Sequence, residues 1–179
     1  KELNKTVNDT AIKGIYEAGN ADGTYTSASW TAFKEAYEAA KNVSEEASTE
    51  ELKTLLTNLQ SAKAGLKNAA VESAKETLKA EVDKAENKNI YEAGNADGTY
   101  TKDSWTTFKE AYEAAKAPSE GATAEELKTL LTNLQNAKAG LKNAAVESAK
   151  ETLKAEVDKA ENKNIYEAGN ADGTYTKDS

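Results

Sequence analysis

The sequence contains no cysteine, no histidine and no methionine, and only one proline. Without cysteine the chain can form no disulfide bond and has no thiolate chemistry. Without histidine it lacks the commonest general base and the commonest metal ligand. Glycine-rich phosphate loops and a serine nucleophile elbow are missing too. The 31 acidic residues are interleaved with lysines at i+3 and i+4, a spacing typical of solvated helix faces. We therefore expect no enzyme activity and no cofactor.

Long apolar runs and basic clusters are also missing. No stretch approaches the roughly 20 apolar residues that span a bilayer. The net charge is −8 and no basic stripe exists, so we expect neither nucleic acid nor an anionic membrane as a partner. No signal peptide follows Lys1, and we expect any signal or anchor to lie outside these residues.

What the sequence has is a repeat. The string IYEAGNADGTYT occurs at residues 15–26, 90–101 and 165–176, and residues 15–89 and 90–164 align without a gap and differ at nine positions. A fixed period of this length is typical of an array of like modules. We predict one module over 1–66 and a second over 67–141. Residues 142–179 are then the first helix and loop of an incomplete third module.

Each period predicts an all-α fold with three helices. The first helix is expected over residues 69–89, followed by a loop over 89–101 that is rich in Gly, Asn and Asp. The second helix begins after Thr101 as N-cap and ends near Pro118. The third begins at a capping box, 123–126 in one copy and 48–51 in the other. The expected architecture is a tandem series of three-helix bundles.

The connection between modules has two interpretations. Only Gly140 interrupts the helical pattern between Leu134 and Asn162, and a lone glycine costs about 1 kcal/mol in a helix. We therefore expect a long shared helix, in which the third helix of one module continues into the first helix of the next. The alternative is a kink or break at Gly65 and Gly140.

The aromatic residues of the second helix recur at helical spacing, as do the aliphatic residues of the other two. Such a stripe can line a ligand groove, but in a module with little other bulk we expect it to form the core. The predicted core residues are Trp30, Phe33, Tyr37, Leu52, Leu56, Leu59, Leu78, Val82, Trp105, Phe108, Tyr112, Leu127, Leu131 and Leu134.

The NADG segment offers oxygen ligands for calcium at Asn20 and Asp22, and again at Asn95 and Asp97. An EF-hand also needs an oxygen ligand two residues before Asn20, where Ala18 stands, and a Glu at its twelfth position, where Ser29 stands. We therefore expect no metal, and a long loop folded over one end of the bundle.

The pattern of the second and third helices resembles the FIVAR module ("found in various architectures"). It is carried here by Tyr100, Thr101, Ser104, Trp105, Phe108, Ala111, Ala114, Ala115, Thr123, Glu126, Leu127, Leu131, Leu134 and Leu141. The resemblance implies three-helix bundles in large surface proteins of Gram-positive bacteria and in some secreted carbohydrate-active enzymes. It also implies a role in stalks or attachment, with fibronectin or sugar binding in some members.

Two functions follow as hypotheses. In the first, the modules are the structural stalk of a cell-wall-attached adhesin and project a distal binding domain, and their partners are other modules of the same chain. In the second, they are a multivalent array that binds a host matrix protein or glycan weakly at each module, with a repeated patch around Tyr16 and Tyr91. An accessory segment of an enzyme is a third possibility.

Overall fold

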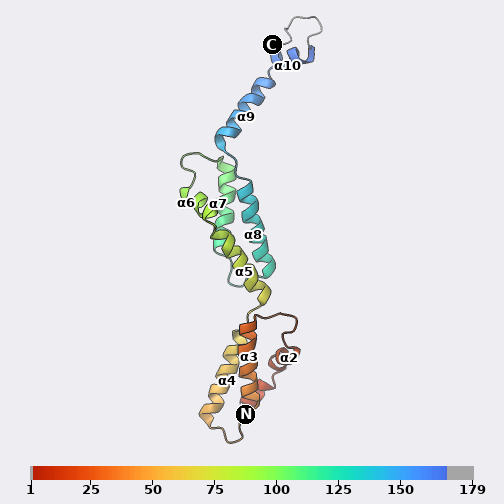
Figure 1. Ribbon diagram of the computed structural model, residues 1–179, viewed down its shortest axis with the longest axis vertical. Helices are drawn as coiled ribbons and strands as arrows, with labels where there is room; N and C mark the ends of the chain where they lie inside the picture. The colour runs from red at the N-terminus through yellow and green to blue at the C-terminus, as the bar shows by residue number, and fades with distance from the viewer. Residues whose placement is uncertain (1, 169–179) are drawn as a thin grey trace. The chain divides into compact units, whose positions relative to one another are not determined.

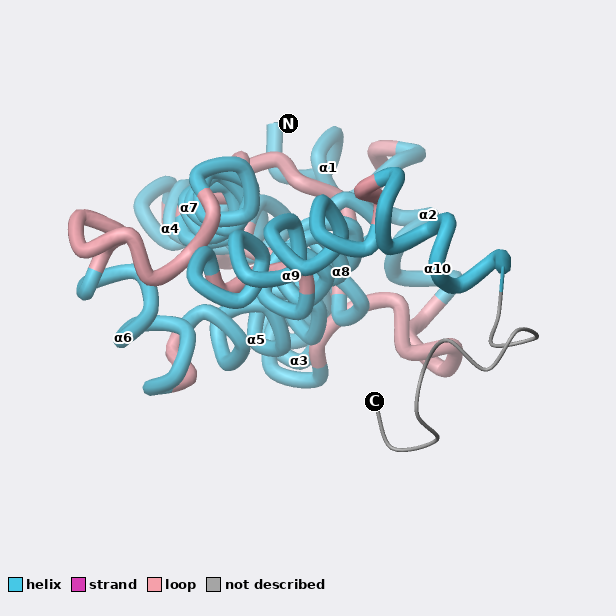
Figure 2. Tube along the Cα trace, turned by 90° about the horizontal axis from the view of Figure 1, so that it is seen from above, coloured by secondary structure: helices cyan, strands magenta, loops and turns pink. Residues whose placement is uncertain are grey.

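The computed structural model describes residues 2–168, which form helices joined by loops, with no strand among them (Figures 1 and 2). This confirms the predicted all-α class. The helices are α1 Glu2–Val7, α2 Thr10–Ala18, α3 Ser27–Lys41, α4 Thr49–Ala64, α5 Ala69–Val82, α6 Ala85–Ala93, α7 Lys102–Lys116, α8 Ala124–Ala139, α9 Ala144–Val157 and α10 Ala160–Ala168.

The expected shared helix is wrong, and the alternative break at Gly65 and Gly140 is what the structure has. α4 ends at Ala64 and α5 begins at Ala69, while α8 ends at Ala139 and α9 begins at Ala144. The break has a local cause on its C-terminal side, because the Asn68 side chain accepts a hydrogen bond from the Val71 amide at 3.1 Å. An asparagine N-cap starts a new helix instead of extending the old one.

The expected first helix over 69–89 is likewise two helices. α5 ends at Val82, α6 begins at Ala85, and the same corner separates α1 from α2. In the first copy Asp9 caps α2 by accepting hydrogen bonds from the amides of Ala11 and Ile12, each at 3.1 Å. α6 continues to Ala93, so the loop expected over 89–101 was predicted to begin too early. The actual loop begins at Gly94.

Both boundaries of the second helix and the start of the third agree with the prediction. α7 begins directly after Thr101 and ends before Pro118. The Ser48 hydroxyl accepts from the Glu51 amide, and the Glu51 carboxylate accepts from the Ser48 amide, which is a complete capping box at the start of α4. Thr123 and Glu126 make the same exchange before α8. Both capping boxes are confirmed.

Contacts group the chain into two compact units, Lys1–Glu81 with Ala117–Leu131, and Val82–Lys116 with Thr132–Ser179. In the first unit α1 packs against α3 and α4, α3 packs against α4, and α1 contacts α2. Their shared core consists of Leu3, Val7, Ile12, Phe33, Tyr37, Ala40 and Leu59. In the second unit α6 contacts α7, and α9 contacts α10. The predicted limits 1–66, 67–141 and 142–179 stay a prediction.

Candidate functional site

The structure brings the loop before α3 against the segment that separates α4 from α5. The Thr26 amide donates to the Lys67 carbonyl at 2.9 Å, and the Ala69 amide donates to the Thr24 carbonyl at 3.0 Å. Tyr25 and Asn68 form an isolated antiparallel bridge between these two bonds. We call residues 24–29 together with 67–69 the clasp. Its backbone bonds are a short ladder that fixes the path of the chain as it leaves α4.

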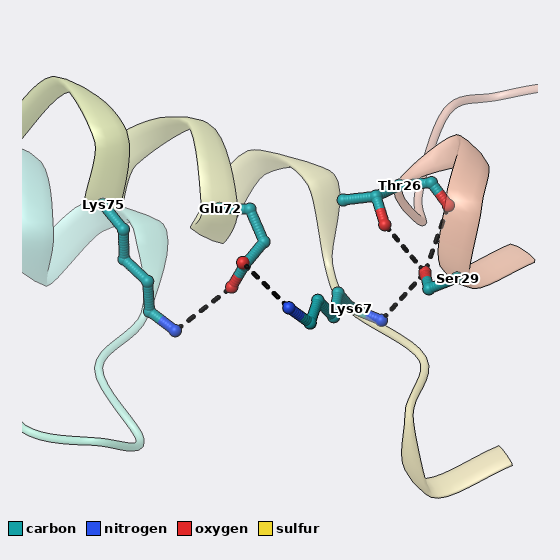
Figure 3. A network of polar contacts seen from close by, with 5 residues as sticks. All are labelled: Thr26, Ser29, Lys67, Glu72 and Lys75. Carbon is teal, nitrogen blue, oxygen red and sulfur yellow. Dashed lines mark hydrogen bonds and ion pairs between the residues drawn. The ribbon is translucent and has the colours of Figure 1, made fainter. Parts of the chain in front are cut away.

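Ser29 is the hydroxyl at the centre of the clasp (Figure 3). Its Oγ accepts from the Lys67 amide at 3.1 Å, donates to the Thr26 carbonyl at 3.1 Å and lies 2.8 Å from the Thr26 hydroxyl. One atom therefore joins the first turn of α3 to a segment 38 residues away. Thr26 stands at the N-cap of α3, but its side chain makes no capping bond to the backbone because it contacts Ser29 instead.

Charged side chains continue the clasp along the first turns of α5. The Glu72 carboxylate lies 3.7 Å from the Lys67 ammonium and 3.2 Å from the Lys75 ammonium (Figure 3). The hydrogen bond from Lys75 is the main reason that the pKa of Glu72 lies below its ordinary value, and the charge of Lys67 adds to it. These ion pairs are exposed, so they favour one arrangement without adding much stability.

The same clasp occurs 75 residues later, at 99–104 with 142–144. The Thr101 amide donates to the Lys142 carbonyl at 2.9 Å, and the Ala144 amide donates to the Thr99 carbonyl at 3.0 Å. Ser104 Oγ accepts from the Lys142 amide at 3.2 Å. The two clasps agree although the positions just after their threonines differ, Ser27 and Ala28 in one copy against Lys102 and Asp103 in the other. The clasp thus belongs to the repeat and not to one copy.

The oxygen atoms considered for calcium are used by the loop itself. Asn20 accepts from the Tyr25 amide at 2.7 Å and donates to the Tyr25 carbonyl at 2.9 Å, while Asp22 accepts from the Thr24 amide at 3.0 Å. Asn95 and Asp97 make the same bonds in the second copy. Among the residues that the structure describes, no group of three or more acidic side chains is placed to hold a metal ion. These four side chains therefore shape the loop that carries the clasp.

An aromatic ladder runs from the loop down α3. Neighbouring ring centroids are 6.2 Å apart for Tyr25 and Trp30, 5.7 Å for Trp30 and Phe33, 6.2 Å for Phe33 and Tyr37, and 4.2 Å for Tyr37 and Tyr16. The ladder connects the clasp, through Tyr25, with the buried core. The second copy repeats it through Tyr100, Trp105, Phe108, Tyr112 and Tyr91.

The outer end of the ladder is polar. The Tyr16 hydroxyl donates to Glu38 at 2.8 Å, and the Lys41 ammonium lies 5.9 Å from the centre of the Tyr16 ring. The hydrogen bond to Glu38 raises the pKa of Tyr16 above its ordinary value. Tyr91, expected as part of a repeated patch, makes the same contact with Glu113 at 2.9 Å. The hydroxyl and one ring face of each tyrosine therefore contact residues of its own unit.

The predicted core residues differ in how far they are covered. The structure buries Phe33, Tyr37, Leu59, Leu78, Val82, Phe108, Tyr112, Leu127 and Leu134. It half-buries Trp30, Leu52, Leu56, Trp105 and Leu131. Trp30, Leu52 and Leu56 pack against the edge of the buried core. Neither indole is fully covered, because each lies on the ladder next to the clasp.

A shallow depression also recurs. One of about 570 Å³ lies against the turn after α3 and the first turns of α4, and one of about 510 Å³ lies against the corresponding turn and the first turns of α8. Four of the nine differences between the copies fall in the turn before α4 or α8, and a fifth is the first residue of the helix itself: Asn42/Ala117, Val43/Pro118, Glu46/Gly121, Ser48/Thr123 and Thr49/Ala124. The depression in the first copy is lined by Glu46, and the one in the second copy has Gly121 at the same position. The two depressions do not present the same chemistry to a ligand.

The family model described as "FIVAR domain" matches residues 1–67 and 74–142. A comparison with curated proteins and one with solved structures found no similar chain. Within the described part of the chain, no helix is both long and apolar enough to cross a membrane.

Proposed function

Because the chain belongs to the FIVAR family, whose modules are associated with cell surfaces in various architectures, we propose that it is a structural stalk. Its modules project a distal binding domain of an adhesin away from a bacterial cell wall. The stalk performs no catalysis, and the partner of each module is the next module of the same chain.

The observation that carries this proposal is the recurrence of the clasp. A stalk needs its connections to be defined, since a flexible chain reaches only in proportion to the square root of its length. The connecting segment 65–68 is not a free linker, because Lys67 bonds to Thr26 and Ser29 through its carbonyl and its amide. The same bonds at Lys142 support a connection of one kind along the array.

Small-angle scattering on chains of two, four and six modules tests the proposal. We expect the maximum dimension to increase in proportion to the number of modules. Growth with the square root of that number would refute the stalk.

The clasp itself is tested by replacing its central hydroxyl in every module, as in Ser29→Ala with Ser104→Ala. Loss of this bond should shift the scaling toward the square root. The matched control is Ser73→Ala, an exposed serine of α5 outside the clasp, which should leave the dimensions unchanged.

The alternative, a multivalent array for a host matrix protein or glycan, would need one surface repeated in each module. The recurring depression is the best candidate, but its lining differs between Glu46 and Gly121, which argues against a shared ligand. A pull-down with the two-module chain against matrix proteins, serum proteins and glycans separates the two functions. Retention of one of these, abolished by substitutions in the depression, would favour the array.

A further inference from the structure

Each loop that leads into a clasp contains an aspartate followed by a glycine, Asp22 and Gly23 in the first copy and Asp97 and Gly98 in the second. All four residues are exposed. The backbone nitrogen that follows an aspartate can attack the carbon of the side-chain carboxyl group. Glycine hinders this attack least because it has no side chain. The pair is therefore the place in each module where the backbone can rearrange most readily.

The loop needs both members of this reactive pair. Gly23 and Gly98 have φ angles of +71° and +70°, which glycine adopts without strain and other residues do not. The Asp22 carboxylate accepts a hydrogen bond from the Thr24 amide at 3.0 Å. Replacement of either member would therefore strain or open the loop that delivers Thr24 to the clasp.

The closed loop opposes the attack at both reacting groups. The Gly23 amide, which would be the nucleophile, donates to the Asn20 carbonyl at 3.1 Å. Hydrogen bonds from the side chain and the amide of Thr24 hold the pKa of Asp22 below its ordinary value. An ionised carboxylate reacts poorly, because the attack must expel one of its oxygens as water. The same bonds recur in the second copy, from Gly98 to Asn95 at 3.2 Å and from Thr99 to Asp97 at 3.1 Å.

We propose that Asp22 and Asp97 are sites of aspartate isomerisation, which the closed loop prevents and an open loop permits. The bond from Gly23 N to Asp22 Cγ forms, and the amide proton leaves with one carboxyl oxygen as water, which gives a five-membered succinimide ring. Water then adds to the ring. Cleavage of the bond from N to Cγ restores aspartate, and cleavage of the bond from N to the backbone carbonyl carbon gives isoaspartate. The reaction consumes no oxidant and no cofactor, since the water lost in the first step is regained in the second.

Isomerisation at residue 22 would damage the clasp. In isoaspartate the main chain runs through the former side chain and is one carbon longer, and the carboxylate that held the Thr24 amide is displaced. The Thr24 carbonyl, two residues further on, accepts the bond from the Ala69 amide. A transient opening of the loop would thus become permanent. This goes beyond the proposed stalk and does not rest on it, because the site is defined by the loop and not by what the module connects.

The test incubates the full chain at neutral pH, folded and in urea, and measures isoaspartate by electron-transfer mass spectrometry. Cleavage after glutamate gives peptides 18–35 and 93–110, which differ in sequence and report the two sites separately. The rate at each site is expressed as the ratio of folded to unfolded, which removes differences in intrinsic reactivity. We expect isomerisation at both sites to be slower in the folded chain by about threefold or more, since hydrogen bonds must open first.

Two variants open one loop at a time. Asn20→Ala removes both bonds from this side chain to Tyr25 and should raise the ratio at residue 22 by about threefold or more, with residue 97 unchanged. Asn95→Ala should do the reverse. Asn58→Ala, at an exposed position of α4, is the matched control and should change neither site. Hydrogen exchange of the Phe33 amide should stay the same in Asn20→Ala, which separates opening of the loop from unfolding of the module.

Four results would overturn the proposal. Equal rates in the folded chain and in urea would mean that the loop protects nothing. An unchanged ratio in Asn20→Ala, or an equal rise at residues 22 and 97, would mean that this loop does not control the reaction. Faster exchange at Phe33 would assign the reaction to unfolding of the module. Finally, the isoaspartate form of the incubated chain, separated by ion exchange, should show faster exchange of the Ala69 amide than the unmodified form, and equal exchange would disprove the damage to the clasp.

Discussion

The two copies of the repeat differ in one buried residue at the corner between their first two helices. Ile12 is 4% exposed and belongs to the core of the first unit, while its counterpart one period later is Asn87, which is 0% exposed. We predict that Ile12→Asn destabilises the first unit substantially. Sequence comparison of the two copies would suggest the opposite, since asparagine is accepted at the same place.

The magnitude follows from the environment of Ile12. Burial of an isoleucine side chain contributes about 1.5–3 kcal/mol, and an amide among apolar neighbours costs about 1–3 kcal/mol. Part of the cost of burying the amide is offset, because an asparagine at this corner can donate to a carbonyl of the preceding helix, as Asn162 does. We expect a loss of about 2–4 kcal/mol, a large share of the stability of a domain this small.

Urea unfolding followed by tryptophan fluorescence measures this loss. The parent and the variant both carry Trp105→Phe, so that Trp30, which packs against the edge of this core, is the only reporter. Ala11→Asn, at the exposed neighbouring position, is the control for helix propensity and should cost below about 1 kcal/mol. If Ile12→Asn lowers the midpoint by less than about 0.5 M urea, the corner is not part of the core and the reasoning fails.

The remaining predictions concern local backbone geometry and ionisation. Gly14 lies in helical backbone with open space around it, whereas Gly19 has φ +72° and ψ −163°. Gly14→Ala should therefore stabilise the fold by about 1 kcal/mol, and Gly19→Ala should destabilise it by about 1–3 kcal/mol through backbone strain alone. Equal effects of the two substitutions in thermal unfolding would contradict this reasoning. Ser48→Ala removes half of a capping box and should cost about 1 kcal/mol in the same measurement, whereas a neutral result would mean that the box adds no stability. Hydrogen bonds from Ser48 hold the pKa of Glu51 below its ordinary value of 4.5, so its contribution is complete at neutral pH and is lost as the pH falls below about 4.5. A titration of stability against pH should show this loss, and Glu51→Gln should make the curve flatter in that range.

Features set by neighbouring residues could be predicted from the sequence. The capping boxes and the starts of α3 and α7 depend on side chains within four positions, and both features were found where expected. The break between α4 and α5 was available only as an alternative, because the cost of Gly65 in a helix is small. Asn68, three residues later, was the missed signal, since an asparagine before an apolar-periodic run is typical of an N-cap.

Other features have no local signal. The corner before α6 has Lys84 at its N-cap, with no capping bond from the side chain, whereas Asp9 marks the same corner in the first copy. The central bond of the clasp joins Ser29 to a backbone amide 38 residues away, and nothing in the spacing of either residue indicates the other. Such pairings arise from tertiary packing, which a period of hydrophobic residues does not specify.

Both sides of each clasp lie within a single 75-residue period, residues 24–29 and 67–69 in one and 99–104 and 142–144 in the next. Addition or deletion of one whole period would therefore leave each remaining clasp with both of its sides. Arrays with different numbers of this repeat would therefore keep the full set of backbone bonds at every junction.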